Sequence, residues 1–181
     1  MIITSGEYVV EDRFLKFDLA DNLDISEEGN CYLVTGGNGY GKTTFIERVV
    51  IPAIKEEGLH FLYLGQDIRT QLYTLRALLS VRGFKVSGVD EYQLLEMWIA
   101  QSRSARIFLL DEYDKYLPDF NFIFGLCDIF IRTYFIVSHL DPQRIQPDPV
   151  KYHLRRAAFE LTGFDGRIKN IRIHLEDLWP R

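Results

Sequence analysis

The amino-acid sequence predicts an α/β fold in which a mostly parallel sheet is flanked by helices and carries antiparallel strands at its edges. Two segments, RIFLLDE (106–112) and YFIVSH (134–139), are apolar almost throughout and lack the alternation of a half-exposed strand. Strands of this kind are buried on both faces, as in a parallel sheet covered by helices. The tail HLRRAAFELTGFDGRIKNIRIHLEDL predicts an antiparallel hairpin that turns near Asp165 and Gly166.

The remaining elements follow in chain order. Strands are expected over four short segments: 2–10, 14–19, 31–35 and 59–65. Helices are expected over four segments with helical apolar spacing, the first interrupted by Pro52: 43–55, 69–82, 90–101 and 120–131. The last helix would join the two buried strands into a strand–helix–strand unit. With 181 residues the chain suits one sizeable core, so we expect a single domain over residues 1–181.

Composition and charge narrow the class of protein. A net charge of −5 without a Lys/Arg block argues against nucleic-acid binding as the main role. Cys31 and Cys127 form neither a disulfide framework nor a metal-binding pattern, and we expect both to be reduced core residues. The N-terminus lacks the features of a signal peptide, and no apolar run is long enough to span a bilayer. We therefore expect a cytoplasmic protein that reaches the inner face of a membrane only through a partner.

A glycine-rich segment between a predicted strand and a predicted helix carries the strongest functional signal. It matches the pattern G-x-x-x-x-G-K-[ST], and its residues are Gly36, Gly37, Asn38, Gly39, Tyr40, Gly41, Lys42 and Thr43. The glycines let successive N–H groups turn inward around phosphate oxygens, and the following helix adds the positive end of its dipole. Lys42 would reach the β and γ phosphates, and the Thr43 hydroxyl would bind Mg²⁺. The segment predicts a nucleotide site.

Two carboxylates end the first buried strand. Asp111 and Glu112 follow the apolar run and would face different groups, because successive strand residues point to opposite sides. The carboxyl ends of parallel strands form the ligand edge of such a sheet, where the phosphate loop also lies. We expect Asp111 to hold Mg²⁺ in its outer shell and Glu112 to act as the general base on the attacking water.

These motifs together resemble the ATP-binding-cassette (ABC) ATPases. Asn38, Gly39 and the pair Thr43-Thr44 match the form of the phosphate loop that this family favours. Four further features occur in the family's order: Gln66 after a strand, Ser87-Gly88 before a helix, the acidic motif LLDEYDKYL (109–117) and His139 after a strand. The resemblance implies a P-loop NTPase fold with a helical subdomain at about residues 67–101. It also implies an enzyme that binds and hydrolyses Mg²⁺-ATP.

The resemblance also assigns roles to particular residues. The catalytic residues would be Lys42, Glu112 and His139, and the metal ligands Thr43, Gln66 and Asp111. Thr44 and Gln66 would join the phosphate loop in nucleotide binding. Tyr8, Phe14 and Phe17 are candidates to stack on adenine, and we favour Phe14. Two domains, as a homodimer or heterodimer, would pair head to tail around ATP, with Ser87 and Gly88 acting in trans.

Three departures from the family pattern leave alternatives open. The segment between Gln66 and Ser87 is short, the signature keeps only Ser87-Gly88 and adds Asp90, and Pro118 occupies the usual D-loop aspartate position. We expect the ATP-binding subunit of a transporter that works with a membrane permease. The alternatives are a non-transport ATPase of the DNA-maintenance or phage-defence type within a soluble complex, and a nucleotide-gated interaction module with little turnover. A small-molecule kinase shares the loop but would need an Arg-rich lid, which residues 69–82 do not supply.

Overall fold

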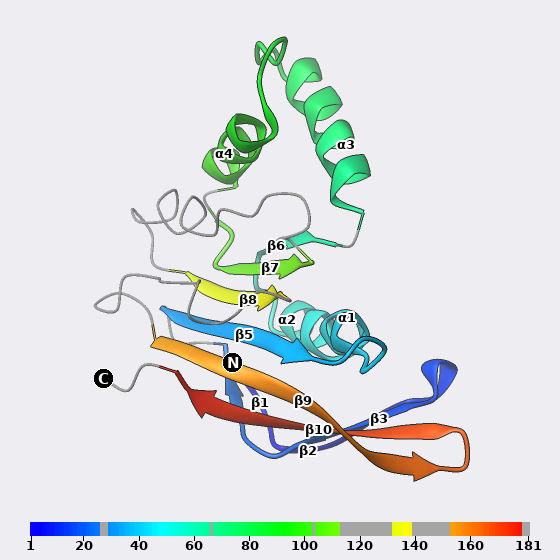
Figure 1. Cartoon of the computed structure of the whole chain (residues 1–181). Coiled ribbons are helices and arrows are strands. Elements are labelled where there is room, and N and C mark those ends of the chain that lie inside the picture. Colours follow the sequence, from blue (N-terminus) through cyan, green and yellow to red (C-terminus); the bar gives the residue numbers. More distant parts are fainter. Residues whose placement is uncertain (26–28, 66, 103, 113–131, 139–152, 179–181) are drawn as a thin grey trace.

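The computed structural model describes residues 1–25, 29–65, 67–102, 104–112, 132–138 and 153–178. Among these residues, eight strands form one mixed sheet (Figure 1). In spatial order they are β2 (Gly6–Val10), β3 (Leu15–Leu19), β10 (Ile168–Asp177), β9 (His153–Asp165), β5 (Asn30–Gly36), β8 (Thr133–Val137), β7 (Ile107–Asp111) and β6 (Phe61–Leu64). Two short strands, β1 (Ile2–Ile3) and β4 (Leu23–Asp24), pair separately and antiparallel.

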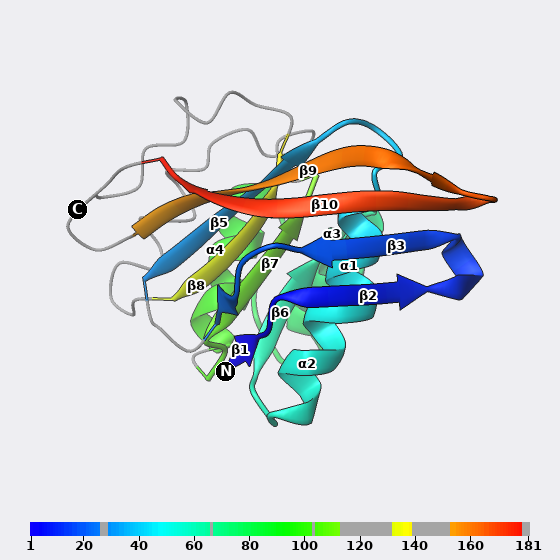
Figure 2. The same ribbon diagram turned by 90° about the horizontal axis from the view of Figure 1, so that it is seen from below.

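The sheet is parallel on one side and mixed on the other. Strands β9, β5, β8, β7 and β6 are parallel neighbours, so their carboxyl ends meet at one edge. Strand β10 is antiparallel to β9 and parallel to β3, and β2 is antiparallel to β3. Figure 2 shows β2, β3, β9 and β10 lying side by side. The predicted mostly parallel sheet with antiparallel edge strands is confirmed, and the expected tail hairpin is the β9–β10 pair.

The buried strands pack into a separate core on each face of the sheet. In β7, Ile107 and Leu109 belong to the core formed with the helical segment after the phosphate loop. Phe108 and Leu110 belong to the core formed with α3 (Ile68–Val81) and α4 (Glu91–Gln101). Alternating residues therefore meet apolar neighbours on both sides, which explains why this strand shows no polar alternation. Figure 1 shows α3 and α4 standing beyond β6 and β7 at one end of the sheet.

The helical segment after the phosphate loop continues through Pro52, but its geometry changes just before the proline. It consists of α1 (Lys42–Phe45), a π-helical turn (Ile46–Val50) and α2 (Ile51–Glu56). Proline has no N–H to donate to the carbonyl four residues earlier, so a regular α-helix would lose a hydrogen bond here. The wider π-helical turn lies directly before the proline, and the Ile51 N–H donates to the Ile46 carbonyl. The interruption expected at Pro52 takes this form.

The N-terminal segment differs from the single strand expected over residues 2–10. It divides into β1 and β2, and Gly6, with a φ of 147°, starts the second strand. A 3₁₀ turn (Glu11–Arg13) joins β2 to β3, and Phe14 caps it in the left-handed region. Cys31 is fully buried, as expected, and burial raises the pKa of its thiol. Cys127 and the helix expected over 120–131 lie outside the described residues.

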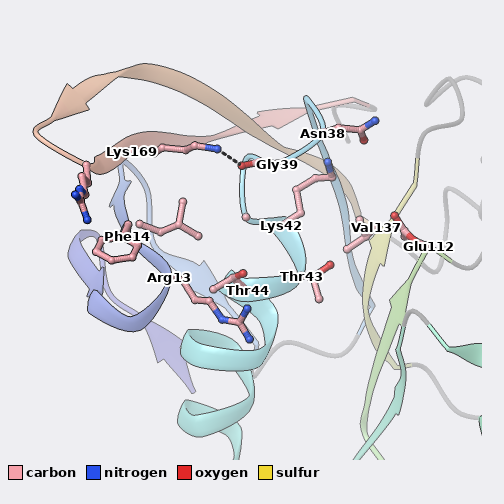
Figure 3. A pocket seen from close by; sticks show the side chains of 13 residues that line it. Arg13, Phe14, Asn38, Gly39, Lys42, Thr43, Thr44, Glu112, Val137 and Lys169 are labelled. Atoms are coloured by element: carbon pink, nitrogen blue, oxygen red, sulfur yellow. Dashed lines mark hydrogen bonds between the residues drawn. The ribbon is translucent and has the colours of Figure 1, made fainter.

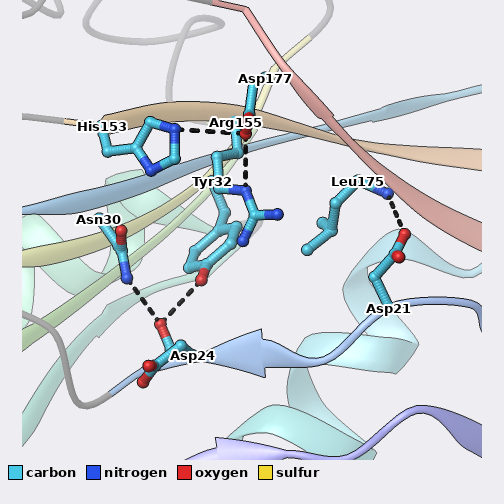
Figure 4. A network of polar contacts seen from close by, with 8 residues as sticks. All are labelled: Asp21, Asp24, Asn30, Tyr32, His153, Arg155, Leu175 and Asp177. Carbon is cyan, nitrogen blue, oxygen red and sulfur yellow. Dashed lines mark hydrogen bonds and ion pairs between the residues drawn. The ribbon is translucent and has the colours of Figure 1, made fainter. Parts of the chain in front are cut away.

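A network of polar contacts joins the strands at the end of the sheet away from the phosphate loop (Figure 4). The Asp24 carbonyl accepts hydrogen bonds from Tyr32 Oη at 2.7 Å and Asn30 Nδ2 at 3.0 Å. The Asp177 carboxylate pairs with Arg155 at 3.0 Å and with His153 at 3.2 Å. These contacts tie β4 to β5 and β9 to β10, and so support the central strand from both sides. Within the described ranges, no helix combines the length and apolarity needed to cross a bilayer.

Candidate nucleotide site

A pocket of about 480 Å³ opens at the edge where the phosphate loop lies (Figure 3). It is lined by residues from the N-terminal strands, the phosphate loop, the end of β7 and β8, and the β9–β10 hairpin. The described lining residues are Arg13, Phe14, Leu15, Asn38, Gly39, Gly41, Lys42, Thr43, Thr44, Glu112, Val137, Arg167 and Lys169. Glu112 and Val137 lie at one end and Phe14 at the other, with Lys42 and Thr43 between them.

The loop takes its shape from close packing against the neighbouring strands. A Cβ on Gly36 would lie 2.7 Å from the Phe159 carbonyl oxygen, so β9 leaves no room for a side chain there. Gly41 caps α1 with a φ of 78°, and a Cβ there would lie 2.7 Å from Leu15 Cδ1. Both positions therefore require glycine. The loop joins β5 to α1 as a P-loop does, and the fold is a P-loop α/β fold.

Tyr40 and Lys42 both contact the backbone at the start of the loop. The Tyr40 ring covers Gly37, where a Cβ would lie 2.8 Å from Tyr40 Cζ. The Lys42 side chain is buried, and its ammonium donates to the carbonyls of Gly36 at 2.9 Å and Gly37 at 3.0 Å. These carbonyls hold the cation beside the loop, where phosphate oxygens can replace them as acceptors. Asn38, Gly39 and Thr44 contribute to the pocket wall.

A hydrogen bond joins the start of α1 to the end of β7. Thr43 Oγ1 donates to Asp111 Oδ2 at 2.8 Å, and Asp111 is fully buried. No donor among the described residues reaches Asp111 Oδ1. Burial raises the pKa of Asp111 to about 6; the Thr43 hydrogen bond lowers it, and the neighbouring Glu112 and Glu47 carboxylates raise it further.

A buried carboxylate oxygen without a donor is costly unless another partner compensates it. Asp111 Oδ1 and the Thr43 hydroxyl are oxygen ligands of the kind that Mg²⁺ prefers. Mg²⁺ is commonly held by one or two such protein groups together with water and phosphate oxygens. The residues present at the Thr43–Asp111 pair therefore fit a magnesium ion.

Glu112 reaches the pocket through an unusual backbone conformation. Strand β7 ends at Asp111, and Glu112 follows with a φ of 52° while its N–H donates to the Val137 carbonyl at 3.1 Å. The left-handed conformation costs a non-glycine residue roughly 1–2 kcal/mol. Such strained residues cluster at functional sites, where the surrounding structure holds them in place. The half-buried Glu112 side chain thus lies at the same edge as Lys42 and Asp111.

Phe14 is the candidate aromatic residue that lies at the pocket. Its side chain is 51% exposed, and its φ is 52°. Phe17 is fully buried and packs edge-on against Phe45, with 5.3 Å between ring centroids. Tyr8 packs against the core, and its hydroxyl donates to the Thr4 carbonyl at 2.6 Å. Of the three aromatic residues considered for adenine stacking, Phe14 alone is among the described pocket-lining residues.

Ser87 and Gly88 lie on the exposed connector between α3 and α4, away from this chain's own pocket. Arg76 holds the connector, because its guanidinium donates to the carbonyls of Val86 and Val89, both at 2.8 Å. The Asp90 carboxylate caps α4 by accepting from the Gln93 N–H at 2.8 Å. Gln66, His139 and Pro118 lie outside the described residues, so their expected roles stay predictions.

Three cationic residues at the pocket were not anticipated from the sequence: Arg13, Arg167 and Lys169. Each lies in a short charged stretch that reads as a turn or an edge strand, where charged residues are common. A signal was nevertheless present, because Lys169 lies two residues before Ile171 and four before Ile173 and so extends the core-facing row of a predicted strand. That this row ends at the phosphate loop follows only from the way β10 pairs with its neighbouring strands in the structure.

Comparison with known proteins finds similarity in structure but not in sequence. No protein-family model matches the chain, and no curated protein matches it in sequence. Among solved structures, it is similar to a KaiC-like protein from the hyperthermophilic archaeon Pyrococcus horikoshii, with 14% sequence identity and a TM-score of 0.46. That match covers 83% of this chain and 80% of the other. The assignment of the P-loop rests on the geometry of β5, α1 and β7.

Proposed function

We propose that the chain binds and hydrolyses Mg²⁺-ATP. The observation that carries the proposal is the convergence of three groups at one sheet edge: the Lys42 ammonium, the Thr43–Asp111 pair and the Glu112 carboxylate. They come from two segments that are far apart in sequence, 42–43 and 111–112, and each group supplies a different requirement of phosphoryl transfer. These requirements are charge neutralisation, a cation site and a base for water.

The roles follow from position. Lys42 and the loop N–H groups bind the β and γ phosphates, and Thr43 and Asp111 hold Mg²⁺, which neutralises the charge of the phosphate oxygens. Glu112 accepts a proton from a water molecule whose oxygen forms the new bond to the γ phosphorus, while the bond to the β,γ-bridging oxygen breaks. The products are ADP and inorganic phosphate. Gln66 and His139 complete the site according to the family resemblance.

Replacing Lys42 by methionine tests nucleotide binding. The variant keeps a similar buried stem but removes the ammonium, and hydrogen bonds to a charged group contribute about 1.5–3 kcal/mol. We expect ATP affinity, measured by calorimetric titration, to fall by about 10- to 100-fold. Lys55→Met, at the exposed end of α2, is the matched control and should bind as the wild type does. Equal ATP affinity in wild type and Lys42→Met would refute the proposed site.

The finer proposal is head-to-tail pairing of two such domains around ATP, with Ser87 and Gly88 acting in trans, in the ATP-binding subunit of a transporter. The family resemblance supports it, and the exposure of Ser87 and Gly88 leaves them accessible to a second domain. A pull-down from the native cell with the Glu112→Gln variant and ATP identifies the partner. A membrane permease would support the transporter role, and a soluble complex would support the non-transport alternative.

Replacing Ser87 by arginine tests the pairing. A long charged side chain at the proposed contact should block ATP-dependent dimerisation on size-exclusion chromatography, while the ATP affinity of the monomer stays unchanged. Ser80→Arg, the same substitution at an exposed position on α3, is the control and should dimerise normally. A dimer yield in Ser87→Arg equal to that of the wild type would exclude the in-trans role.

One observation favours a second candidate, the nucleotide-gated module with little turnover. The Asp90 carboxylate occupies the N-terminus of α4, which in the paired arrangement would face the other domain's γ phosphate. A carboxylate there opposes a phosphate by charge repulsion and takes up an N–H group that could otherwise bind it. If wild type binds ATP but releases phosphate no faster than Glu112→Gln with its partner supplied, this second function is the correct one.

A further inference from the structure

The two ends of the pocket are formed by different segments of the chain. Around Lys42 and Thr43 it is made of the phosphate loop and the start of α1, whereas its far end is formed by the N-terminal turn and the β9–β10 hairpin. Three cationic residues line the pocket, and all three come from the segments that form this far end: Arg13, Arg167 and Lys169. Among the described lining residues the one carboxylate, Glu112, lies at the opposite end. In a chain with a net charge of −5, this is a local concentration of positive charge.

The arrangement of the strands explains how Lys169 comes to this place. On β10, Ile171 and Ile173 are fully buried in the core that contains Phe17 and Phe45. Lys169 lies two residues before Ile171, so it continues the same row just where β10 leaves the core. A residue of this row close to the core would be expected to be apolar. The change to lysine coincides with the start of the pocket.

Lys169 contacts both sides of the pocket. Its N–H donates to the Phe14 carbonyl at 2.9 Å, and its ammonium donates to the Gly39 carbonyl of the phosphate loop at 3.4 Å (Figure 3). The first contact fixes its backbone beside the candidate adenine-stacking residue. The second is long for a hydrogen bond, so it can be exchanged readily for a stronger contact with a phosphate oxygen.

The β9–β10 hairpin extends past the end of β5, on the side of the phosphate loop. Strand β9 pairs with β5 as far as Phe159 opposite Gly36, and beyond that point it pairs only with β10. The register between β9 and β10 shifts between Asn170 and Ile171, directly beside Lys169. Bulges of this kind bend a strand and redirect its side chains, and they occur often next to active sites. The hairpin therefore continues past the end of β5, and its Lys169 contacts the phosphate loop at Gly39.

We propose that Lys169 is a second phosphate-binding lysine, which acts within the same chain on the α phosphate of the nucleotide. The direction follows from the pocket: the γ phosphate lies toward Glu112 and the base toward Phe14, so a cation between Phe14 and Gly39 faces the α phosphate. Arg167, from the same hairpin, adds to the positive potential. Bound nucleotide then connects the hairpin to the phosphate loop. This inference rests on the proposed function, because it requires that the pocket holds a nucleotide.

The test compares nucleotide affinities of Lys169→Met with those of the wild type. Loss of one charged phosphate contact should weaken ATP and ADP binding equally, each by about 10-fold in calorimetric titration. Lys169→Arg, which keeps the charge, should restore most of the affinity. Arg172→Met is the matched control, because Arg172 lies on the same strand but pairs with Asp18 at 3.1 Å and is not among the pocket residues. It should bind both nucleotides as the wild type does.

A second readout follows the hairpin itself. ADP should slow amide hydrogen exchange across residues 161–169 in the wild type, and this protection should disappear in Lys169→Met while protection of the phosphate loop remains. Unchanged ATP and ADP affinity in Lys169→Met would overturn the inference, and so would a loss confined to ATP, since that places the contact at the γ phosphate. If Lys42→Met loses binding and Lys169→Met does not, only this inference fails. If wild type binds no nucleotide, the proposed function fails with it.

Discussion

Replacing Glu112 by glutamine is expected to lower the rate of phosphate release from Mg²⁺-ATP by a factor of about 10² to 10⁴, the usual contribution of a positioned general base. Glutamine has the same shape but cannot accept the proton of the attacking water. ATP affinity should stay unchanged, because the phosphate loop, Lys42 and the Thr43–Asp111 pair are not altered. ATP should therefore accumulate uncleaved, and the variant should elute as an ATP-bound dimer on size-exclusion chromatography.

The measurement is a steady-state phosphate-release assay together with ATP titration. Glu56→Gln makes the same chemical change at the exposed end of α2 and should retain the turnover of the wild type. A Glu112→Gln variant that still turns over at the wild-type rate would show that another group activates the water. The left-handed backbone conformation is imposed on residue 112 by its surroundings, so glutamine would adopt it with the same strain. The difference in turnover between the wild type and Glu112→Gln therefore reports on the carboxylate alone.

Replacing Asp111 by asparagine is expected to stabilise the nucleotide-free protein above neutral pH and to impair catalysis. Burial raises the pKa of Asp111 from 3.8 to about 6, so the ionised form is disfavoured in the folded state. The stability linked to this group is fully present below pH 3.8 and is lost as pH rises through 6. Asparagine does not ionise, so at pH 7.5 its advantage in free energy of unfolding should be roughly 1–3 kcal/mol.

Thermal unfolding across pH 4 to 8, without nucleotide or Mg²⁺, measures this difference. The advantage of Asp111→Asn should vanish near pH 4 and reach its full size above pH 7. Mg²⁺-dependent phosphate release should fall by about 10- to 100-fold, because a cation ligand is weakened. Asp165→Asn, at the exposed hairpin turn, controls for the loss of one negative charge from the chain. An advantage that does not change with pH would mean that ionisation of Asp111 does not set the stability.

Elements dominated by short-range patterns were predictable. The apolar segments that form β7 and β8 show no polar alternation because both faces of the sheet are covered there. This pattern can be recognised in the amino-acid sequence alone. The phosphate loop is equally local, since a glycine pattern, a lysine and a threonine follow one another directly. Even Gly36 and Gly41, whose need for glycine comes from Phe159 and Leu15, are part of a recognisable motif.

Features that depend on which partner a side chain finds were not predictable in the same way. The sequence placed Asp90 close to a proposed phosphate contact but could not say whether its charge turns away. The structure shows that it caps α4, and the reason is local: Asp90 and Gln93 form a capping box. Phe14 was one of three candidate aromatic residues, and only the packing of Phe17 and Tyr8 separates them.

The amino-acid sequence by itself determined the α/β class, the burial of the central strands on both faces and the phosphate loop. Each of these follows from a pattern of residues that are close together in the sequence. The tertiary structure alone decided which side chains surround that loop. Thr43 meets Asp111 because β8 separates β5 from β7 and all three strands end at one edge. Lys169 reaches Gly39 because the β9–β10 hairpin extends past the end of β5. Strand order and register are properties of the whole sheet, and no single segment encodes them.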